Sequence, residues 1–176
     1  MRNRLQILLV VACAVLLVGS AACMVWGEND GAGSTPVALP RARQGAPMPL
    51  EHGLVASERA GTPISATFEL EGRKRHLLVY TMQGDTFLEV IVDEMTGKVV
   101  TVEAITSGEA LTAATAQGAV MVKATKSLRA AVEAALTLHP GFRALRVVPA
   151  LKGAQPVAEI TVVKDGTVTT VVEPLE

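Results

Sequence analysis

The stretch Leu88-Glu89-Val90-Ile91-Val92-Asp93-Glu94-Met95-Thr96-Gly97-Lys98-Val99-Val100 is the clearest strand–turn–strand pattern in this chain. An apolar segment of strand-forming residues runs into an acidic turn, and a second apolar segment leaves it. Gly97 provides the positive φ that such a turn needs, because it has no Cβ. Asp93 and Thr96 can hydrogen-bond to the nearby backbone. The pattern therefore predicts two antiparallel strands and a structural turn made by Asp93, Thr96 and Gly97.

The residues on either side of this stretch extend the sheet. Ile64–Leu70 alternates apolar and polar residues, which is typical of a half-buried strand. Leu77–Met82 is almost entirely apolar, which favours a central position. Phe87–Val92 and Lys98–Ile105 complete the set. Four consecutive strands with short turns predict an antiparallel meander.

Beyond this meander the apolar pattern becomes helical. Thr106 or Ser107, with Glu109, resembles a capping box at the start of an Ala-rich helix that runs to about residue 124. Ser127–His139 repeats apolar residues every three or four positions, so it predicts a second helix. Pro140-Gly141 ends this helix. Three more strands are predicted at Phe142–Val148, Val157–Val163 and Thr167–Glu173.

The two halves of this pattern resemble each other. Gly72 and Gly153 each close the first hairpin of a half, and Thr86 and Thr167 each begin its last strand; both pairs are 81 residues apart. This spacing indicates a duplicated helix-and-hairpin unit, whose helix is clear only in the second copy. We expect an α+β fold in which one antiparallel sheet of meander and hairpin strands carries one or two helices on one face.

The N-terminal residues 1–26 predict a membrane anchor or a signal segment. Arg2 and Arg4 precede the apolar run Leu5–Trp26, which as a helix would span roughly 33 Å at about 1.5 Å per residue. Basic residues before such a segment stay on the cytoplasmic side, so the rest of the chain is expected outside. For a bacterial protein this means a single-pass inner-membrane protein with its C-terminal domain in the periplasm or another non-cytoplasmic lumen.

A cleaved N-terminus is the alternative. Ser20-Ala21-Ala22 is an acceptable cleavage site after an apolar run, and Cys23 is a candidate for lipidation. Cleavage would give a secreted protein, and lipidation a lipid-anchored one. All of these readings place the folded domain on the non-cytoplasmic side.

The remaining chain divides into three predicted segments. Residues 27–60 are rich in proline and glycine and predict a linker, with one short helical turn at its end. Residues 61–106 form the first β unit. Residues 107–176 form the helix and the second β unit. We expect the two units to share one globular domain, because a few strands cannot bury an apolar face alone.

Composition excludes several classes of function. A formal net charge of −1 leaves no basic footprint for nucleic acid. Aromatic residues make up only 3% of the chain, too few for a surface that stacks bases or sugars. Both cysteines, Cys13 and Cys23, lie in the N-terminal apolar run. The rest of the chain therefore has no thiolate metal site and no redox pair.

Parts of the chain resemble the PepSY domain family. The resemblance rests on Leu77-Leu78-Val79-Tyr80 and on Phe87–Val100, which contains Val-Asp-x-x-Thr-Gly-Lys-Val. The Ala-rich helix Ser127–Leu136, followed by Pro140-Gly141 and a hairpin, resembles the family's other part. Together these matches cover about residues 62–176. The first copy departs from the family in lacking a clear helix, and the second in lacking the Val-Asp-x-x-Thr-Gly ending, so the match is to a degenerate tandem.

The resemblance implies an exported or membrane-associated α+β domain. The PepSY family is similar to part of the propeptides that inhibit secreted metallopeptidases, and is thought to regulate peptidase activity locally. For this chain it implies a non-enzymatic domain that binds or regulates another envelope protein or peptidase. No cofactor and no small-molecule substrate is expected.

Few side chains qualify as a functional site. His52, His76 and His139 lack a second ligand at metal-binding spacing. No Ser, Cys or Lys has an identifiable base, so neither catalytic nor metal residues are predicted. The basic hairpin tip Arg73-Lys74-Arg75 is the one candidate for contact with a partner.

Three functional hypotheses follow. The first is a binding module tethered to the membrane through residues 5–26, which binds its partner at an exposed sheet edge, either Ile64–Leu70 or Thr167–Glu173. The second is an accessory component of a membrane assembly or of a bacterial organelle membrane such as the magnetosome. The third is a cleaved, secreted domain that resembles a protease inhibitor.

Overall fold

The protein is described here from a computed structural model, which describes residues 48–72 and 74–176. All described residues lie in one compact unit of the chain, Leu39–Glu176. The predicted membrane segment and most of the predicted linker therefore lie outside the described residues. Within the described ranges, no helix has the length and apolar character needed to cross a bilayer.

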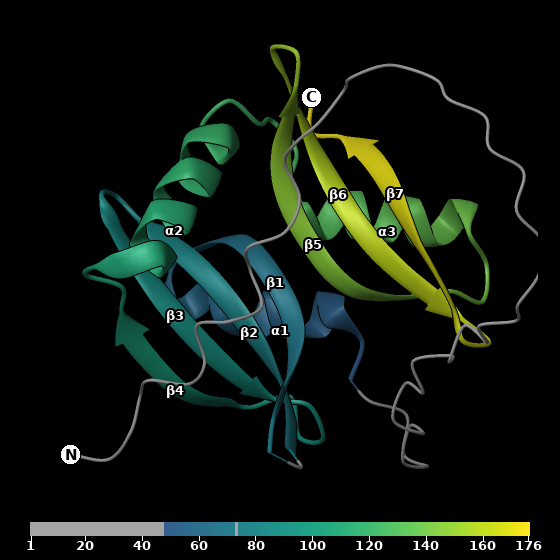
Figure 1. Cartoon of the computed structure of the whole chain (residues 1–176), viewed down its shortest axis with the longest axis horizontal. Coiled ribbons are helices and arrows are strands. Elements are labelled where there is room, and N and C mark those ends of the chain that lie inside the picture. Colours follow the sequence, from purple (N-terminus) through teal and green to yellow (C-terminus); the bar gives the residue numbers. More distant parts are fainter. Residues whose placement is uncertain (1–47, 73) are drawn as a thin grey trace, which may run out of the picture. The chain divides into compact units, whose positions relative to one another are not determined.

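The described part of the chain alternates between helices and runs of strands (Figure 1). Its helices are α1 (Leu50–Ser57), the 3-10 helix η1 (Glu58–Ala60), α2 (Gly108–Met121) and α3 (Leu128–Leu138). Its strands are β1 (Thr62–Glu71), β2 (Lys74–Gln83), β3 (Thr86–Asp93), β4 (Val99–Ala104), β5 (Arg143–Lys152), β6 (Gln155–Lys164) and β7 (Thr167–Pro174).

The seven strands form one antiparallel sheet in the order β4-β3-β2-β1-β5-β6-β7. The first four strands make the predicted meander, and the last three make a second one. The two meanders join where β1 pairs with β5, through Ala66 opposite Val147 and Thr67 opposite Arg146. The α+β class and the antiparallel sheet are thus as predicted. The prediction that Ile64–Leu70 is an edge strand is wrong, because β1 lies inside the sheet.

The internal repeat is confirmed by the bounds of the strands. Adding 81 to the bounds of β1, β2 and β3 gives those of β5, β6 and β7. Both copies also carry a bulge at the same place, between Pro63 and Ser65 in β1 and between Ala144 and Arg146 in β5. Ala66 and Val147, which face each other where the copies join, are 81 residues apart. The two copies are therefore related by an approximate twofold axis at this pair.

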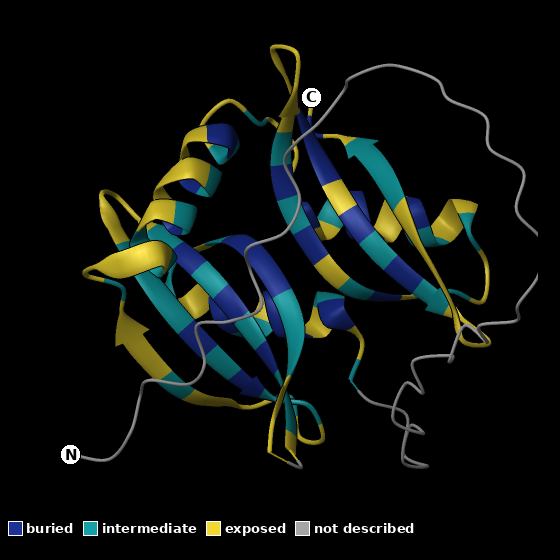
Figure 2. Cartoon of the chain, in the orientation of Figure 1, coloured by how far each residue is buried: buried dark blue, intermediate teal, exposed yellow. Residues whose placement is uncertain are grey.

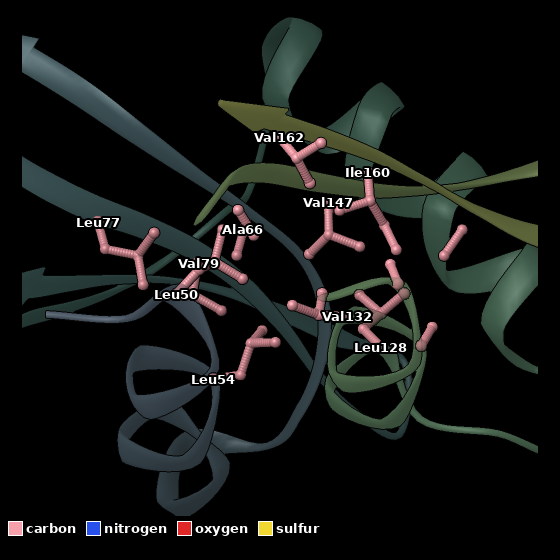
Figure 3. Packing of buried hydrophobic residues seen from close by; sticks show 14 of the residues in the cluster. Leu50, Leu54, Ala66, Leu77, Val79, Leu128, Val132, Val147, Ile160 and Val162 are labelled. Atoms are coloured by element: carbon pink, nitrogen blue, oxygen red, sulfur yellow. The ribbon is translucent and has the colours of Figure 1, made fainter. Parts of the chain in front are cut away.

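One face of the sheet is covered by α1 and α3, one helix from each copy. Equivalent strand positions supply its buried side chains: Leu77 and Ala158, and Val79 and Ile160, are each 0% exposed. Leu54 of α1 and Val132 of α3 pack against them as part of one cluster (Figure 3). Each fully buried Val, Leu or Ile contributes about 1.5–3 kcal/mol, so this shared core holds the copies together.

The third helix, α2, lies against the opposite face. A Cβ on its Gly118 would meet the Phe87 ring and the Met82 sulfur. Met82 follows the fully buried Thr81 in β2, and successive strand residues point to opposite faces. The expectation that the helices share one face is therefore wrong for α2. Gly118 weakens helix propensity, but it allows this close approach.

The helix starts follow the sequence closely. Ser127 caps α3, and its hydroxyl accepts a hydrogen bond from the Ala130 N–H at 3.2 Å. Ser107 is the N-cap residue of α2, as expected, but its side chain makes no capping hydrogen bond. The predicted capping box is therefore not formed, although the helix begins where predicted.

The predicted linker extends too far into the domain. From Leu50 onward the chain folds as α1 and η1, and Leu50, Leu54 and Ser57 are almost completely buried. The Ser57 hydroxyl donates to the Leu54 carbonyl at 2.8 Å. The first copy thus has a helix ahead of its strands, like the second, and residues 50–60 belong to the core.

Candidate functional site

The turn after β3 is held by the side chain of Asp93. Its carboxylate Oδ1 accepts hydrogen bonds from the N–H of Met95 at 3.1 Å, the N–H of Thr96 at 2.8 Å and the Thr96 hydroxyl at 2.8 Å. The Gly97 N–H donates to the Asp93 carbonyl at 2.8 Å, and Gly97 has a φ of +67°. Asp93, Thr96 and Gly97 therefore shape the backbone, the role that the sequence analysis assigns to them.

These hydrogen bonds also affect the charge of Asp93. The Thr96 hydroxyl, then the Thr96 backbone N–H, holds the pKa of the Asp93 carboxyl below its usual value. The carboxylate therefore stays ionised at neutral pH. All of its recorded hydrogen bonds come from its own turn, which leaves a structural role as the sufficient explanation.

The first described residue of the domain, Met48, contacts the same turn. The Met48 N–H donates to the Glu94 carbonyl at 3.0 Å. A Cβ on Gly97 would lie 3.0 Å from the Met48 sulfur. The turn thus fixes the point at which the chain enters the domain, immediately before α1.

The predicted basic tip is divided between two environments. Arg75 is only partly exposed: its guanidinium forms an ion pair with Glu94 and lies over the Phe68 ring, 5.6 Å from the centroid. Lys74 is exposed, and Arg73 lies outside the described residues. Arg75 therefore makes contacts within the domain, to Glu94 and Phe68. Of the described residues of the tip, Lys74 is the one exposed to a partner.

A small hollow lies beside Arg75. It has a volume of about 130 Å³ and lies between the start of α1, the end of α3 and the start of β5. Phe68, Phe142 and Leu136 line it with apolar surface, and Arg75 and Arg143 add charge. A space of this size holds a few water molecules or one small side chain, well below the usual volume of a site for a small-molecule ligand.

The histidines do not form a metal site. Within residues 48–72 and 74–176 no three His, Cys, Asp or Glu residues come close enough to hold a metal ion. His139 is the C-cap residue of α3 and makes an edge contact with Phe142, with ring centroids 5.9 Å apart. His76 lies in β2 opposite Asp93. The helix end and the Phe142 contact thus account for the position of His139, and strand pairing accounts for that of His76.

The side of the sheet away from α1 and α3 carries Tyr80. Burial raises the pKa of its phenol, and the charges of Glu89 and Glu69 raise it further. Glu89 pairs directly with Tyr80 across the β2–β3 ladder. Tyr80 is therefore neutral at physiological pH and unsuited to act as a base or nucleophile.

Among the described strands, β4 and β7 form the two edges of the sheet. The predicted edge Thr167–Glu173 corresponds to β7, whereas β4 is an edge that was not predicted from the sequence. β4 carries three exposed valines, which we call the β4 valines: Val99 is 40% exposed, Val100 66% and Val102 48%. Figure 2 shows β4 largely as exposed surface at the end of the sheet.

The β4 valines are exposed because no helix of the described residues packs closely on β4. Val99 and Val102 pair with the buried Val92 and Val90 of β3, so they point to the face that α1 covers. The short helix α1 packs on β1 and β2, and less on β3 and β5. In the second copy the longer α3 reaches the outermost strand, β7. The first copy is thus incompletely covered at its outer edge.

The sequence does carry a signal for this edge. A four-strand meander joined to a second unit through its first strand leaves its last strand free. β4 has a bulge where its pairing with β3 passes from Ile91 to Val92. Around this bulge, valines of β4 lie on both faces of the sheet. The choice between β1 and β4 nevertheless depends on the long-range β1–β5 pairing, which local alternation does not encode.

Comparisons with known proteins give little further information. No family model matches the chain, and no curated protein is significantly similar to it. One solved structure matches, the crystal structure of a protein described as a "putative lipoprotein" from Clostridium difficile 630, with 14% sequence identity and a TM-score of 0.38. The match covers 72% of this chain and 93% of that protein. At this TM-score it carries no argument about function.

Proposed function

We propose that this chain is a non-enzymatic, membrane-tethered binding module that takes up an extended segment of another envelope protein or peptidase along β4. The exposure of the β4 valines on a free sheet edge is the observation that carries this proposal. The tether would be residues 5–26, with the folded domain on the non-cytoplasmic side. The sequence resemblance to PepSY domains, which are thought to regulate peptidase activity locally, supports this choice of partner.

Strand addition explains how β4 would bind. An edge strand offers N–H and C=O groups that are not used within the sheet, and an added strand pairs with them. Side chains at alternate positions of that strand then meet Val99 and Val102 on one face. A partner segment with apolar residues at every second position fits this edge, because it would cover the valines that α1 leaves exposed.

The start of β4 adds a charge preference. Lys98 precedes the strand and is exposed. A partner segment therefore fits best with an acidic residue near Lys98. Such rim charges set register and orientation more than affinity.

The test places one lysine in the middle of the proposed contact. Val102→Lys adds charge and flexibility to the edge, and edge lysines oppose strand pairing. Val122→Lys, at the 75%-exposed C-cap of α2, is the matched control, because it makes the same change at an exposed valine elsewhere. A photo-crosslinking residue at Val100 of the full chain in envelope membranes would identify the bound protein.

We expect Val100 to crosslink to a defined segment of one envelope protein, and Val102→Lys but not Val122→Lys to remove that product. Binding should also slow amide hydrogen exchange in β4, because strand addition uses its free N–H groups. Unchanged crosslinking in Val102→Lys, or a partner that leaves β4 exchange unaffected, would show that the edge is not the binding surface.

A further inference from the structure

The two copies differ at their outer edges. β3 and β7 are equivalent strands, because their bounds are 81 residues apart. The outer side of β3 pairs with β4, from Leu88 opposite Ala104 to Val92 opposite Val99. No described strand occupies the equivalent place beside β7. Among the described residues, this strand position of the repeat is therefore unfilled.

The sequence of β7 does not protect this edge. Residues 167–172, Thr-Val-Thr-Thr-Val-Val, contain no charge and no proline, and strands of this composition pair readily. Val168 is 49% exposed. Hydrogen bonds hold the chain after this segment: the N–H groups of Thr125 and Lys126 donate to the Leu175 carbonyl at 2.8 and 3.0 Å. They do not involve residues 167–172. No strand of the described part of the chain pairs with the outer side of 167–172.

We infer that β7 pairs with β7 of a second copy of this chain, antiparallel and about a twofold axis, so that two sheets become one. The two repeats within one chain are already joined in this way, through the antiparallel pairing of Ala66 with Val147. An uncharged Thr–Val strand also fits itself, because antiparallel pairing of two such strands brings no like charges together.

The pleat of the sheet fixes the register of this pairing. Val168, Thr170 and Val172 lie on one face, because they pair with Val163, Thr161 and Glu159 of β6. Residues directly opposite each other must share a face, so the axis passes through a residue and not between two residues. Centring the pairing on residues 167–172 leaves Thr169 or Thr170 as this residue. An axis at Thr169 would place Asp165 opposite Glu173 of the second copy, two like charges. The axis therefore lies at Thr170, with Val168 opposite Val172.

Cysteine crosslinking tests this register directly. In a Cys13→Ser, Cys23→Ser background of the full chain in detergent micelles, Thr170→Cys should form a disulfide-linked dimer. Residues opposite each other on antiparallel strands have Cα atoms about 4.5–5.5 Å apart, within the disulfide range of about 4.4–6.8 Å. Thr169→Cys is the control: its Cα atoms would be roughly 8 Å apart, and disulfides need less than about 7 Å.

Charge variants test the dimer without a crosslink. The unit Leu39–Glu176 holds the whole described core, so its mass can be followed by sedimentation. Thr170 is exposed, so Thr170→Lys should leave the folded state intact while it places two positive charges opposite each other. We expect the dimer dissociation constant to rise by about tenfold or more, and an equimolar mixture of Thr170→Lys and Thr170→Glu to dimerise again.

The possible outcomes separate this inference from its alternatives. Thr170→Cys dimers with little Thr169→Cys dimer, together with rescue by the charge mixture, would support it. A wild-type unit that stays monomeric at its highest soluble concentration would overturn it, as would equal crosslinking of both cysteine variants. A dimer that survives Thr170→Lys but is lost in Val102→Lys would assign self-association to β4 instead. Capture of a foreign Thr–Val peptide by a monomer would assign β7 to another partner.

Discussion

Thr81 should weaken the domain in which it lies, and replacing it with valine should stabilise the fold. Its side chain is 0% exposed, and among the described residues its hydroxyl has no hydrogen-bond partner. The equivalent residue of the second copy, 81 positions later, is Val162, which is also 0% exposed. Thr81→Val therefore makes the first copy like the second at this position, with almost no change of shape.

The magnitude follows from the cost of an unpaired buried hydroxyl, about 1–3 kcal/mol. Thr81→Val removes this cost and adds one buried methyl group, so we expect the free energy of unfolding to rise by about 1–2 kcal/mol. For a domain of this size that corresponds to an increase in Tm of roughly 3–6 °C. The reverse change, Val162→Thr, should lower the unfolding free energy by about 1–3 kcal/mol.

Urea unfolding of Leu39–Glu176, followed by circular dichroism, measures both variants, and an unchanged slope would show that the unfolded state is unaffected. If Thr81→Val destabilised the domain, its hydroxyl would have a partner and the argument would fail. If Val162→Thr left the unfolding free energy unchanged, position 162 would tolerate a buried hydroxyl. The free-energy cost assigned to the Thr81 hydroxyl would then be wrong.

Two further predictions concern the turn after β3. Gly97→Val should lower the free energy of unfolding by about 1–3 kcal/mol, because a β-branched residue strains a φ of +67°. Gly72→Val is the control in thermal unfolding: Gly72 has a similar φ of +62° but open space around its Cβ position, so an equal loss in both variants would exclude a contribution from the Met48 contact. The second concerns acid. The folded pKa of Asp93 is lowered, so its stabilisation is present above about pH 3.9 and lost as pH falls through the folded pKa. Asp93→Ala should therefore flatten the acid limb of the stability–pH curve, and an unchanged acid limb in denaturant titrations would contradict this.

The strands can be predicted because their signals are local. Alternation and turn residues locate all seven, and the 81-residue spacing of Gly72 and Gly153 reveals the repeat in the amino-acid sequence alone. Ser127 and Pro140 bound α3 in the same way. In each case the information lies within a few residues of the element itself.

α1 escapes prediction because its sequence opposes helix formation locally. It follows Pro49 and contains Gly53, and these residues also suit a linker. The structure gives Gly53 a tertiary reason: a Cβ at this position would run into the Leu77 side chain. The glycine allows α1 to pack closely on β2, and packing outweighs its low propensity.

The candidate site is less predictable than the fold. The three residues Arg73-Lys74-Arg75 suggest one charged tip, yet strand alternation in β2 separates Lys74 from Arg75. Arg75 pairs with Leu70 near the end of the β1–β2 ladder and turns toward Phe68 and Glu94. Alternation counted from the buried Leu77 places Arg75 on the core side. The importance of β4, in contrast, depends on how the two copies join and cannot be read locally.

The pairing between β1 and β5 is short, and this shapes how the protein should fold. The ladder registers Ala66 with Val147 and Thr67 with Arg146, whereas the neighbouring hairpins pair along nearly their whole length. Each copy can thus form most of its backbone hydrogen bonds with residues close in sequence, which favours rapid folding. The contacts between copies are mainly side chains in the common core. The hairpins of each half should therefore form early, and their packing into the common core should be the last step to a stable protein.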